Sequence, residues 1–290
     1  MRDDNLLEKE EGSRRPVVLL LLDGFGIDIF GDVNAISTAK PKFFYSLVKD
    51  YPIALLKNSS RDPRKRYWSL GTGEKIKNFS QANTCLSKIL AENNLRHLKI
   101  SSAYNFTYLN LLFNNFNPEP FALEERLMVG QERLDVFSDA KEIIEETKEA
   151  IEENNHDFIT VSLPILDQLS ANYSFKQTVK GVKLLDEYIR KISQLVLDKD
   201  AILLIVSPFG NAEYTKDLST DWLNKEPTNN PVPFLLVAKE YMGKTIGFAD
   251  PLDDDLSLLS PIGGLDVFLP TVLKFLNIEA KHKLMSKSLI

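Results

Sequence analysis

An aspartate in a glycine-rich turn is the residue of this chain best placed for chemistry. Asp23 follows an unbroken apolar run, residues 17–22, and opens the turn Asp23-Gly24-Phe25-Gly26. A short run this apolar is typical of a strand that is buried on both faces of a parallel sheet. Open α/β sheets bind their ligands at the carboxyl ends of the strands, which is where this carboxylate falls. Asp23 could therefore hold a metal ion, although capping the following turn is the commoner role for such an aspartate.

A second aspartate follows another predicted strand. Residues 158–163 are apolar enough to form a strand, and Asp167 comes just after its end. Asp23 and Asp167 together could hold a weakly bound Mg²⁺, because that ion keeps most of its waters. Asp167 could instead cap the long helix predicted to begin near Phe175, and this structural role is again the favoured interpretation.

A basic segment, residues 61–66, offers a different chemistry. Four of its residues are cations: Arg61, Arg64, Lys65 and Arg66. Arginine forks beside aromatic rings, here Tyr67 and Trp68, can bind phosphate groups or nucleic-acid backbones. A solvated charge run is the commoner explanation, and the net charge of −6 makes nucleic-acid binding unlikely. We predict a loop here and keep the four cations as a candidate anion site.

The composition predicts a folded, water-soluble protein. Hydrophobic residues make up 43% of the chain and charged residues 26%, which is normal for a domain with a buried core. The single cysteine cannot form an intramolecular disulfide, as expected in a reducing compartment. No apolar stretch approaches the ~20 residues that a transmembrane helix needs. We expect a cytoplasmic protein with a polar N-terminal segment, residues 1–15, that contains no signal core.

Predicted strands alternate with predicted helices along the rest of the chain. We expect strands at residues 17–22, 52–56, 97–102, 158–163, 201–206 and 233–237, and helices at 35–50, 81–94, 139–154, 175–197 and 266–276. Residues 106–121 are expected to be irregular, and residues 124–126 to lie on a solvated surface. This alternation predicts one α/β domain, residues 16–290, with a mostly parallel sheet flanked by helices on both faces.

Several motifs resemble the cofactor-independent phosphoglycerate mutases of the alkaline phosphatase superfamily. The opening strand with Asp23-Gly24-Phe25-Gly26 is similar to the start of that family, and Gly71-Thr72-Gly73 to its Gly-Ala-Gly turn. Residues 209–213 resemble the piece around a metal-binding Asp-His pair, and residues 230–234 the segment that follows a metal-binding histidine. The matches occur in the family's order across nearly the whole chain. The resemblance therefore implies an alkaline phosphatase-like core.

The resemblance also implies a centre of two divalent cations, typically manganese, and here the chain departs from the family. Asp23 and Asp167 match aspartate ligands. The remaining ligand positions carry Ala171, Pro208, Phe209 and, where a histidine is expected, Pro227 or a neighbour. None of the three histidines of the chain, His97, His156 and His282, is placed in sequence to replace them.

Two further departures concern the nucleophile and the substrate. Pro63 stands where the resemblance places the serine nucleophile, and Asn105 where it places a basic lysine. The family inserts a substrate-holding domain after the Gly-Ala-Gly turn. Between Gly73 and the helix around Leu86 the chain is far too short for the ~50 residues of a domain.

We therefore predict a catalytically inactive pseudoenzyme that acts through protein binding or assembly. No catalytic residue and no cofactor are expected, and Asp23 and Asp167 are interpreted as relict metal ligands. The partner would be an unknown protein, an active paralogue or a larger complex, and not a membrane. The alternative is a divergent metal-dependent phosphomutase or phosphatase acting on a small phosphorylated metabolite, with weakly bound Mn or Mg and a nucleophile such as Ser59. A third interpretation is a small-anion sensor built on residues 61–66.

Overall fold

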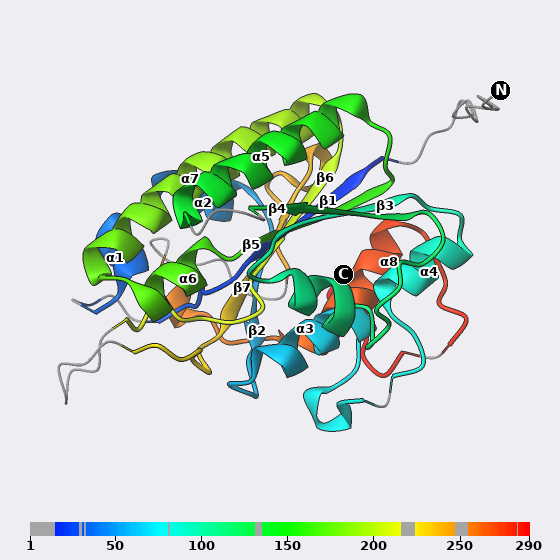
Figure 1. Cartoon of the computed structure of the whole chain (residues 1–290), viewed down its shortest axis with the longest axis horizontal. Helices are drawn as coiled ribbons and strands as arrows, with labels where there is room; N and C mark the ends of the chain where they lie inside the picture. Colours follow the sequence, from blue (N-terminus) through cyan, green and yellow to red (C-terminus); the bar gives the residue numbers. More distant parts are fainter. Residues whose placement is uncertain are drawn as a thin grey trace.

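A computed structural model describes residues 15–28, 31, 33–80, 82–130, 135–215, 224–246, 255–282 and 284–290. Most of the polar N-terminal segment predicted at residues 1–15 lies outside these residues. The described strands are β1 (Val17–Leu22), β2 (Ile53–Lys57), β3 (His97–Ser102), β4 (Glu124–Val129), β5 (Phe158–Leu163), β6 (Ile202–Val206), β7 (Val232–Val237) and β8 (Gly263–Gly264). They form one sheet in the order β4-β3-β5-β1-β6-β7-β2-β8 (Figure 1).

The sheet is mostly parallel, as the sequence predicts. β1 lies between β5 and β6 and runs parallel to both, with Leu22 beside Leu163 at the carboxyl end. β3 and β4 continue the parallel set, whereas β7 is antiparallel to β6 and to β2. The residue after β1 therefore emerges at the centre of the edge where the parallel strands end.

Helices cover both faces of the sheet (Figure 1). One face carries α1 (Ala35–Ala39), α2 (Lys42–Asp50), α5 (Val136–Glu153), α6 (Ile165–Asn172) and α7 (Phe175–Asp198). The other carries α3 (Pro63–Thr72), α4 (Leu86–Glu92), the π-helical turn η2 (Tyr108–Leu112) and α8 (Phe268–Phe275). We refer to the second face as the α3 face.

β1 shows why both layers are needed. All six of its residues are fully buried. Val18, Leu20 and Leu22 pack into the core under α7, and the alternate residues, from Val17 to Leu21, pack into the core of the α3 face. By the same alternation Asp23 points toward the α3 face.

Most predicted elements are confirmed to within a few residues at their ends. The helix predicted at residues 35–50 is wrong as a single element, because Lys40 adopts a left-handed conformation (φ 53°) and Pro41 caps a new helix. Residues 106–121, predicted to be irregular, include the π-helical turn η2.

Two charged segments are not the surface elements that the sequence predicts. The basic segment is the start of helix α3, which begins at Pro63 with the Asp62 carboxylate capping the Arg64 N–H. Residues 124–126 belong to strand β4, where the buried Glu124 pairs with Lys99 at 3.3 Å and with Arg126 at 2.6 Å. Asp62 pairs with Arg64, and Glu124 pairs with Lys99 and Arg126, which the residue types alone do not reveal.

The described helices include none that is both long and apolar enough to cross a membrane.

Gly71 fixes the approach of α3 to the turn η2, and its replacement tests this packing. A Cβ at Gly71 would lie 2.0 Å from the carbonyl oxygen of Phe113, whereas one at Gly31 would meet no described atom within 4 Å. We expect Gly71→Ala to lower the free energy of unfolding by about 1–3 kcal/mol despite the better helix propensity of alanine. Urea denaturation measures this, with Gly31→Ala as the control. Equal stability of the two variants would contradict the close approach.

Candidate functional site

The Asp23 carboxylate lies at the carboxyl end of β1 and is closed off from solvent. Its side chain is 1% exposed. The Tyr67 hydroxyl lies 2.6 Å from Oδ1 and 2.7 Å from Oδ2, so it faces both carboxylate oxygens. The amide of Asn105 is 3.4 Å from Oδ2. Two side chains of the protein thus supply hydrogen-bond donors to this carboxylate.

Ser162 completes the network around Asp23. Its hydroxyl lies 2.7 Å from the Tyr67 hydroxyl and accepts a hydrogen bond from the Asn105 amide. Ser162 comes from β5, Asn105 from the turn after β3, and Tyr67 from α3, so three elements converge on the end of β1. Ser162 points to the α3 face because Phe158 and Thr160 occupy the same side of the strand.

Tyr67 reaches Asp23 because α3 starts where it does. The Asp62 cap and Pro63 fix the first turn, and Tyr67 falls on the buried side of the second. Its ring is fully buried and stacks on Tyr108 of η2, with 5.5 Å between ring centres and 26° between planes. Burial, with Asp23 beside it, raises the pKa of Tyr67 well above its ordinary value, so the hydroxyl stays protonated.

The second predicted aspartate is brought next to the first. The Asp167 backbone N–H donates to the Asp23 carbonyl at 3.1 Å. This approach requires Gly24, which has a φ of +90° and whose Cβ would lie 2.7 Å from the Asp167 nitrogen. Asp167 lies in the first turn of α6, rather than capping the helix at Phe175.

The Asp167 side chain also has partners within the protein. One oxygen accepts from the Tyr104 hydroxyl at 3.0 Å and the other from the Asn211 amide at 3.2 Å. Burial raises the pKa of this carboxyl, and the two hydrogen bonds oppose the rise. The structure thus brings Asp23 and Asp167 together but gives each carboxylate its own hydrogen-bond donors.

A buried arginine and a buried glutamate lie between the neighbouring loops. The Arg66 guanidinium donates to the Thr228 carbonyl at 2.6 Å and to the Asn229 side chain at 3.3 Å. Glu213 accepts from the Gly26 N–H at 3.1 Å and from the Thr228 hydroxyl. The sequence singled out Arg66 as a surface cation and did not single out Glu213 as a site residue.

The four cations of the candidate anion site are divided among different environments. Arg64 is largely exposed and forms a two-pronged ion pair with Asp62, at 2.8 Å for the closest atoms. Lys65 lies 5.9 Å from the centre of the Phe79 ring, and Arg61 is exposed. Because Arg66 is buried, the four do not present one basic surface, and the anion site stays a prediction.

The described residues do not fit a two-metal centre. No three His, Cys, Asp or Glu side chains within them are grouped so that they could hold a metal ion. Ala171, Pro208 and Phe209 stand where the resemblance implies ligands and carry no side chain that can coordinate a cation. The fourth such position is Pro227, which also cannot coordinate one, or a neighbour. Tyr67 faces the two Asp23 oxygens that a metal would need. His97 and His156 lie at the amino ends of β3 and β5, the opposite edge of the sheet.

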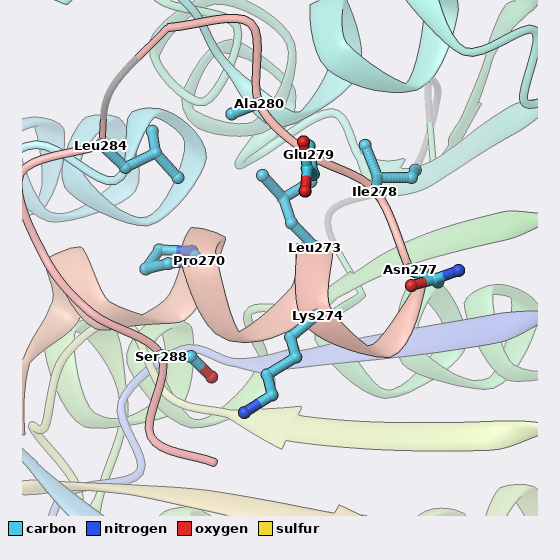
Figure 2. Close-up of a pocket in the computed structure, with 9 residues that line it drawn as sticks. All are labelled: Pro270, Leu273, Lys274, Asn277, Ile278, Glu279, Ala280, Leu284 and Ser288. Carbon is cyan, nitrogen blue, oxygen red and sulfur yellow. The ribbon is translucent and has the colours of Figure 1, made fainter.

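Two hollows that are lined by described residues lie elsewhere. Figure 2 shows one, of about 320 Å³, between α8 and the last residues of the chain, with apolar walls from Leu273, Ile278 and Leu284. The other, of about 460 Å³, lies beside it and shares Lys274 and Asn277. Neither includes Asp23 or Asp167.

Solved structures define the class of fold. An alkaline phosphatase from the Antarctic bacterium TAB5 matches with a TM-score of 0.65 at 12% identity, over 92% of this chain and 100% of that one. A phosphoglycerate mutase from Leishmania mexicana matches with a TM-score of 0.58 at 18% identity, over 72% of this chain and 39% of that one. The fold is that of the alkaline phosphatase superfamily.

The sequence comparison gives the family. Residues 15–280 match the metalloenzyme superfamily, and the chain belongs to it. It is 26% identical over 193 residues to the 2,3-bisphosphoglycerate-independent phosphoglycerate mutase of Clostridium perfringens, covering 65% of this chain and 38% of that protein. The enzyme of the same name from Antithamnion sp. is 27% identical over 213 residues, covering 71% and 39%. The chain thus spans about two fifths of the length of these relatives.

The buried Asp23 carboxyl should make stability depend on pH. Burial raises its pKa from 3.8 to about 8; the Tyr67 hydrogen bond opposes this rise and the charge of Asp167 adds to it. Between these two values the folded state keeps a proton that the unfolded state has lost. The free energy of unfolding therefore falls as pH rises from about 4 to about 8, by at most ~1.4 kcal/mol per pH unit from this group.

Asp23→Asn removes this proton and should flatten the dependence. The neutral amide can replace the protonated carboxyl as donor and acceptor, so we expect the variant to gain stability relative to the wild type as pH rises. Urea denaturation across this pH range measures the difference, with the exposed Glu119→Gln as the control. A constant difference between Asp23→Asn and the wild type would contradict a carboxyl that is protonated when folded.

Proposed function

We propose that this chain is a catalytically inactive member of the metalloenzyme superfamily that acts by binding a protein partner. The observation that carries the proposal is the closed environment of Asp23, whose two oxygens both face the Tyr67 hydroxyl at 2.6 and 2.7 Å. A divalent cation needs several oxygen or nitrogen ligands with free lone pairs. Here the remaining carboxylate, Asp167, has its own hydrogen-bond donors, and apolar side chains fill the other ligand positions.

The competing proposal is a divergent metal-dependent phosphomutase or phosphatase that acts on a small phosphorylated metabolite. What favours it is that Asp23 and Asp167 remain adjacent, with the main chains hydrogen-bonded at 3.1 Å. A weakly bound Mn or Mg could then use both carboxylates if Tyr67 moved away. The relatives named phosphoglycerate mutase would set the substrate class under this alternative.

Metal binding and turnover separate the two proposals. We expect no hydrolysis of p-nitrophenyl phosphate or mutase activity on 3-phosphoglycerate above the level of Asp23→Ala, with or without millimolar Mn²⁺ or Mg²⁺. We also expect no thermal stabilisation by these ions, whereas a bound metal at about a hundredfold excess over its Kd would add about 2.7 kcal/mol. Metal-dependent turnover that Asp23→Ala and Asp167→Asn both abolish would overturn the inactive assignment.

The exposed surface above the closed site is the proposed binding face. Tyr104 is 47% exposed although its hydroxyl bonds Asp167. Tyr108 is partly exposed and stacks on Tyr67, and Arg64 is exposed on the same helix as Tyr67. Tyrosine and arginine are the side chains that most often dominate protein interfaces. We define the binding face by Tyr104, Tyr108 and Arg64.

A paired substitution tests this face. We expect Tyr104→Ala with Arg64→Ala to weaken partner binding by about tenfold or more, since each hot-spot truncation costs upward of ~1 kcal/mol. The matched control is Met242→Ala with Lys239→Ala, an exposed apolar residue and a cation after β7. The measurement is quantitative co-purification from native extracts, compared among wild type, face variant and control. A partner retained equally by all three chains would place binding elsewhere.

A further inference from the structure

Arg66 is a charged side chain held entirely inside the protein. It is 0% exposed, and its guanidinium carbon lies 5.7 Å from the centre of the Phe209 ring. One terminal nitrogen carries its hydrogen bonds, to the Thr228 carbonyl and the Asn229 side chain. Nε and Nη1 have no hydrogen-bond partner among the described residues. Burying a guanidinium in this way is unfavourable unless an opposite charge compensates it.

Glu213 is a buried acidic residue that shares a hydrogen-bonding partner, Thr228, with Arg66. It is 1% exposed, and its charge opposes the fall that burial causes in the pKa of Arg66. The Gly26 N–H donates to one of its oxygens at 3.1 Å, and the Asn230 amide donates to the other at 3.2 Å. The Thr228 hydroxyl also donates to it, having its own oxygen occupied by the Asn230 N–H at 3.3 Å. Burial raises the pKa of Glu213, and these hydrogen bonds oppose the rise because they favour the ionised form.

Thr228 forms a hydrogen bond with each of the two side chains. Its carbonyl accepts from Arg66 and its hydroxyl donates to Glu213, so one residue links cation and anion. The linkage ties together α3, the loop after β6, the segment before β7 and the turn after β1 that contains Gly26. The loop after β6 contains Pro208 and Phe209, and the segment before β7 contains Pro227. These are segments in which the resemblance implies metal ligands, at Pro208, at Phe209 and at Pro227 or a neighbour.

We propose that the Arg66 guanidinium is a built-in cation that holds these carboxyl-end loops together in place of a bound metal ion. Arg66 and Tyr67 are adjacent on α3, so one helical turn reaches Asp23 directly and Glu213 through Thr228. The inference rests on the proposed function, since a chain that bound metal here would not need a guanidinium. It identifies α3 as the element that makes the fold independent of metal.

A double-mutant cycle tests the coupling of the two charges. We expect Arg66→Met to raise the equilibrium constant of unfolding about tenfold or more, because it leaves Glu213 buried without its counter-charge. The double variant Arg66→Met with Glu213→Gln should have an equilibrium constant of unfolding at least about threefold smaller than the value expected if the two single effects simply multiplied. Arg64→Met is the matched control on the same helix and should change the constant by less than about threefold. A chelator should leave the stability of the wild type unchanged.

Three results would contradict the role proposed for Arg66. Arg66→Met no worse than Arg64→Met, single effects that multiply without coupling, or loss of wild-type stability in chelator would each overturn the inference. If Arg66→Met does not fold, Arg66→Lys and the double variant carry the test, and the double variant must then fold. Turnover with Mn²⁺ would defeat the proposed function, whereas a missing coupling between Arg66 and Glu213 would defeat only this inference.

Discussion

The contact between the Tyr67 hydroxyl and the Asp23 carboxyl is the constraint around which the carboxyl end of the sheet is arranged. A carboxyl at the end of the central strand, covered on every side, must find its hydrogen-bond partners within the protein. Tyr67 can serve only if α3 begins at Pro63 and packs closely on η2, where Tyr108 stacks against its ring. Asn105 and Ser162 then fill the remaining directions. The positions of α3, η2 and the turn after β3 therefore depend on one another.

The α3 face of the sheet buries a second cluster of charged and polar side chains, which also find their partners within the protein. Lys99 in the middle of β3 is fully buried and reaches Glu124 at 3.3 Å, while the Asn114 amide donates to both Glu124 oxygens. Burial lowers the pKa of Lys99 to about 8, and Glu124 opposes that shift. Both clusters satisfy buried charges with groups from loops and helices of this face. Such clusters make the packing of the face specific, because each member has a defined partner.

The strands could be predicted from the sequence because their signal is local. Residues 17–22 and 158–163 are apolar runs whose bounds need no knowledge of the rest of the chain. The helix α3 was missed although Asp62-Pro63 is a helix-start signal, because the run of cations that follows suggested a solvated loop. β4 was missed because Glu124 and Arg126 look solvated until Lys99 is placed beside them. Asp23 and Asp167 could be expected to lie close together because both follow predicted strands. The contact of Asp23 with Tyr67, 44 residues away in sequence, could not be expected, because it depends on how α3 packs.

The packing of the sheet and the hydrogen bonds at its carboxyl end are physically separate contributions to the fold. The two apolar layers around the sheet do not need a metal, so the fold can persist when the ligand residues change. A buried carboxyl group needs hydrogen-bond partners even when it is protonated, since leaving a buried polar group unsatisfied costs about 1–3 kcal/mol of the 5–15 kcal/mol that stabilises a typical domain. Asp23 contacts Tyr67 of α3, and Thr228 links Glu213 to Arg66 of the same helical turn. Arg66 and Tyr67, adjacent on α3, therefore connect this one helix to the surroundings of two buried carboxyl groups.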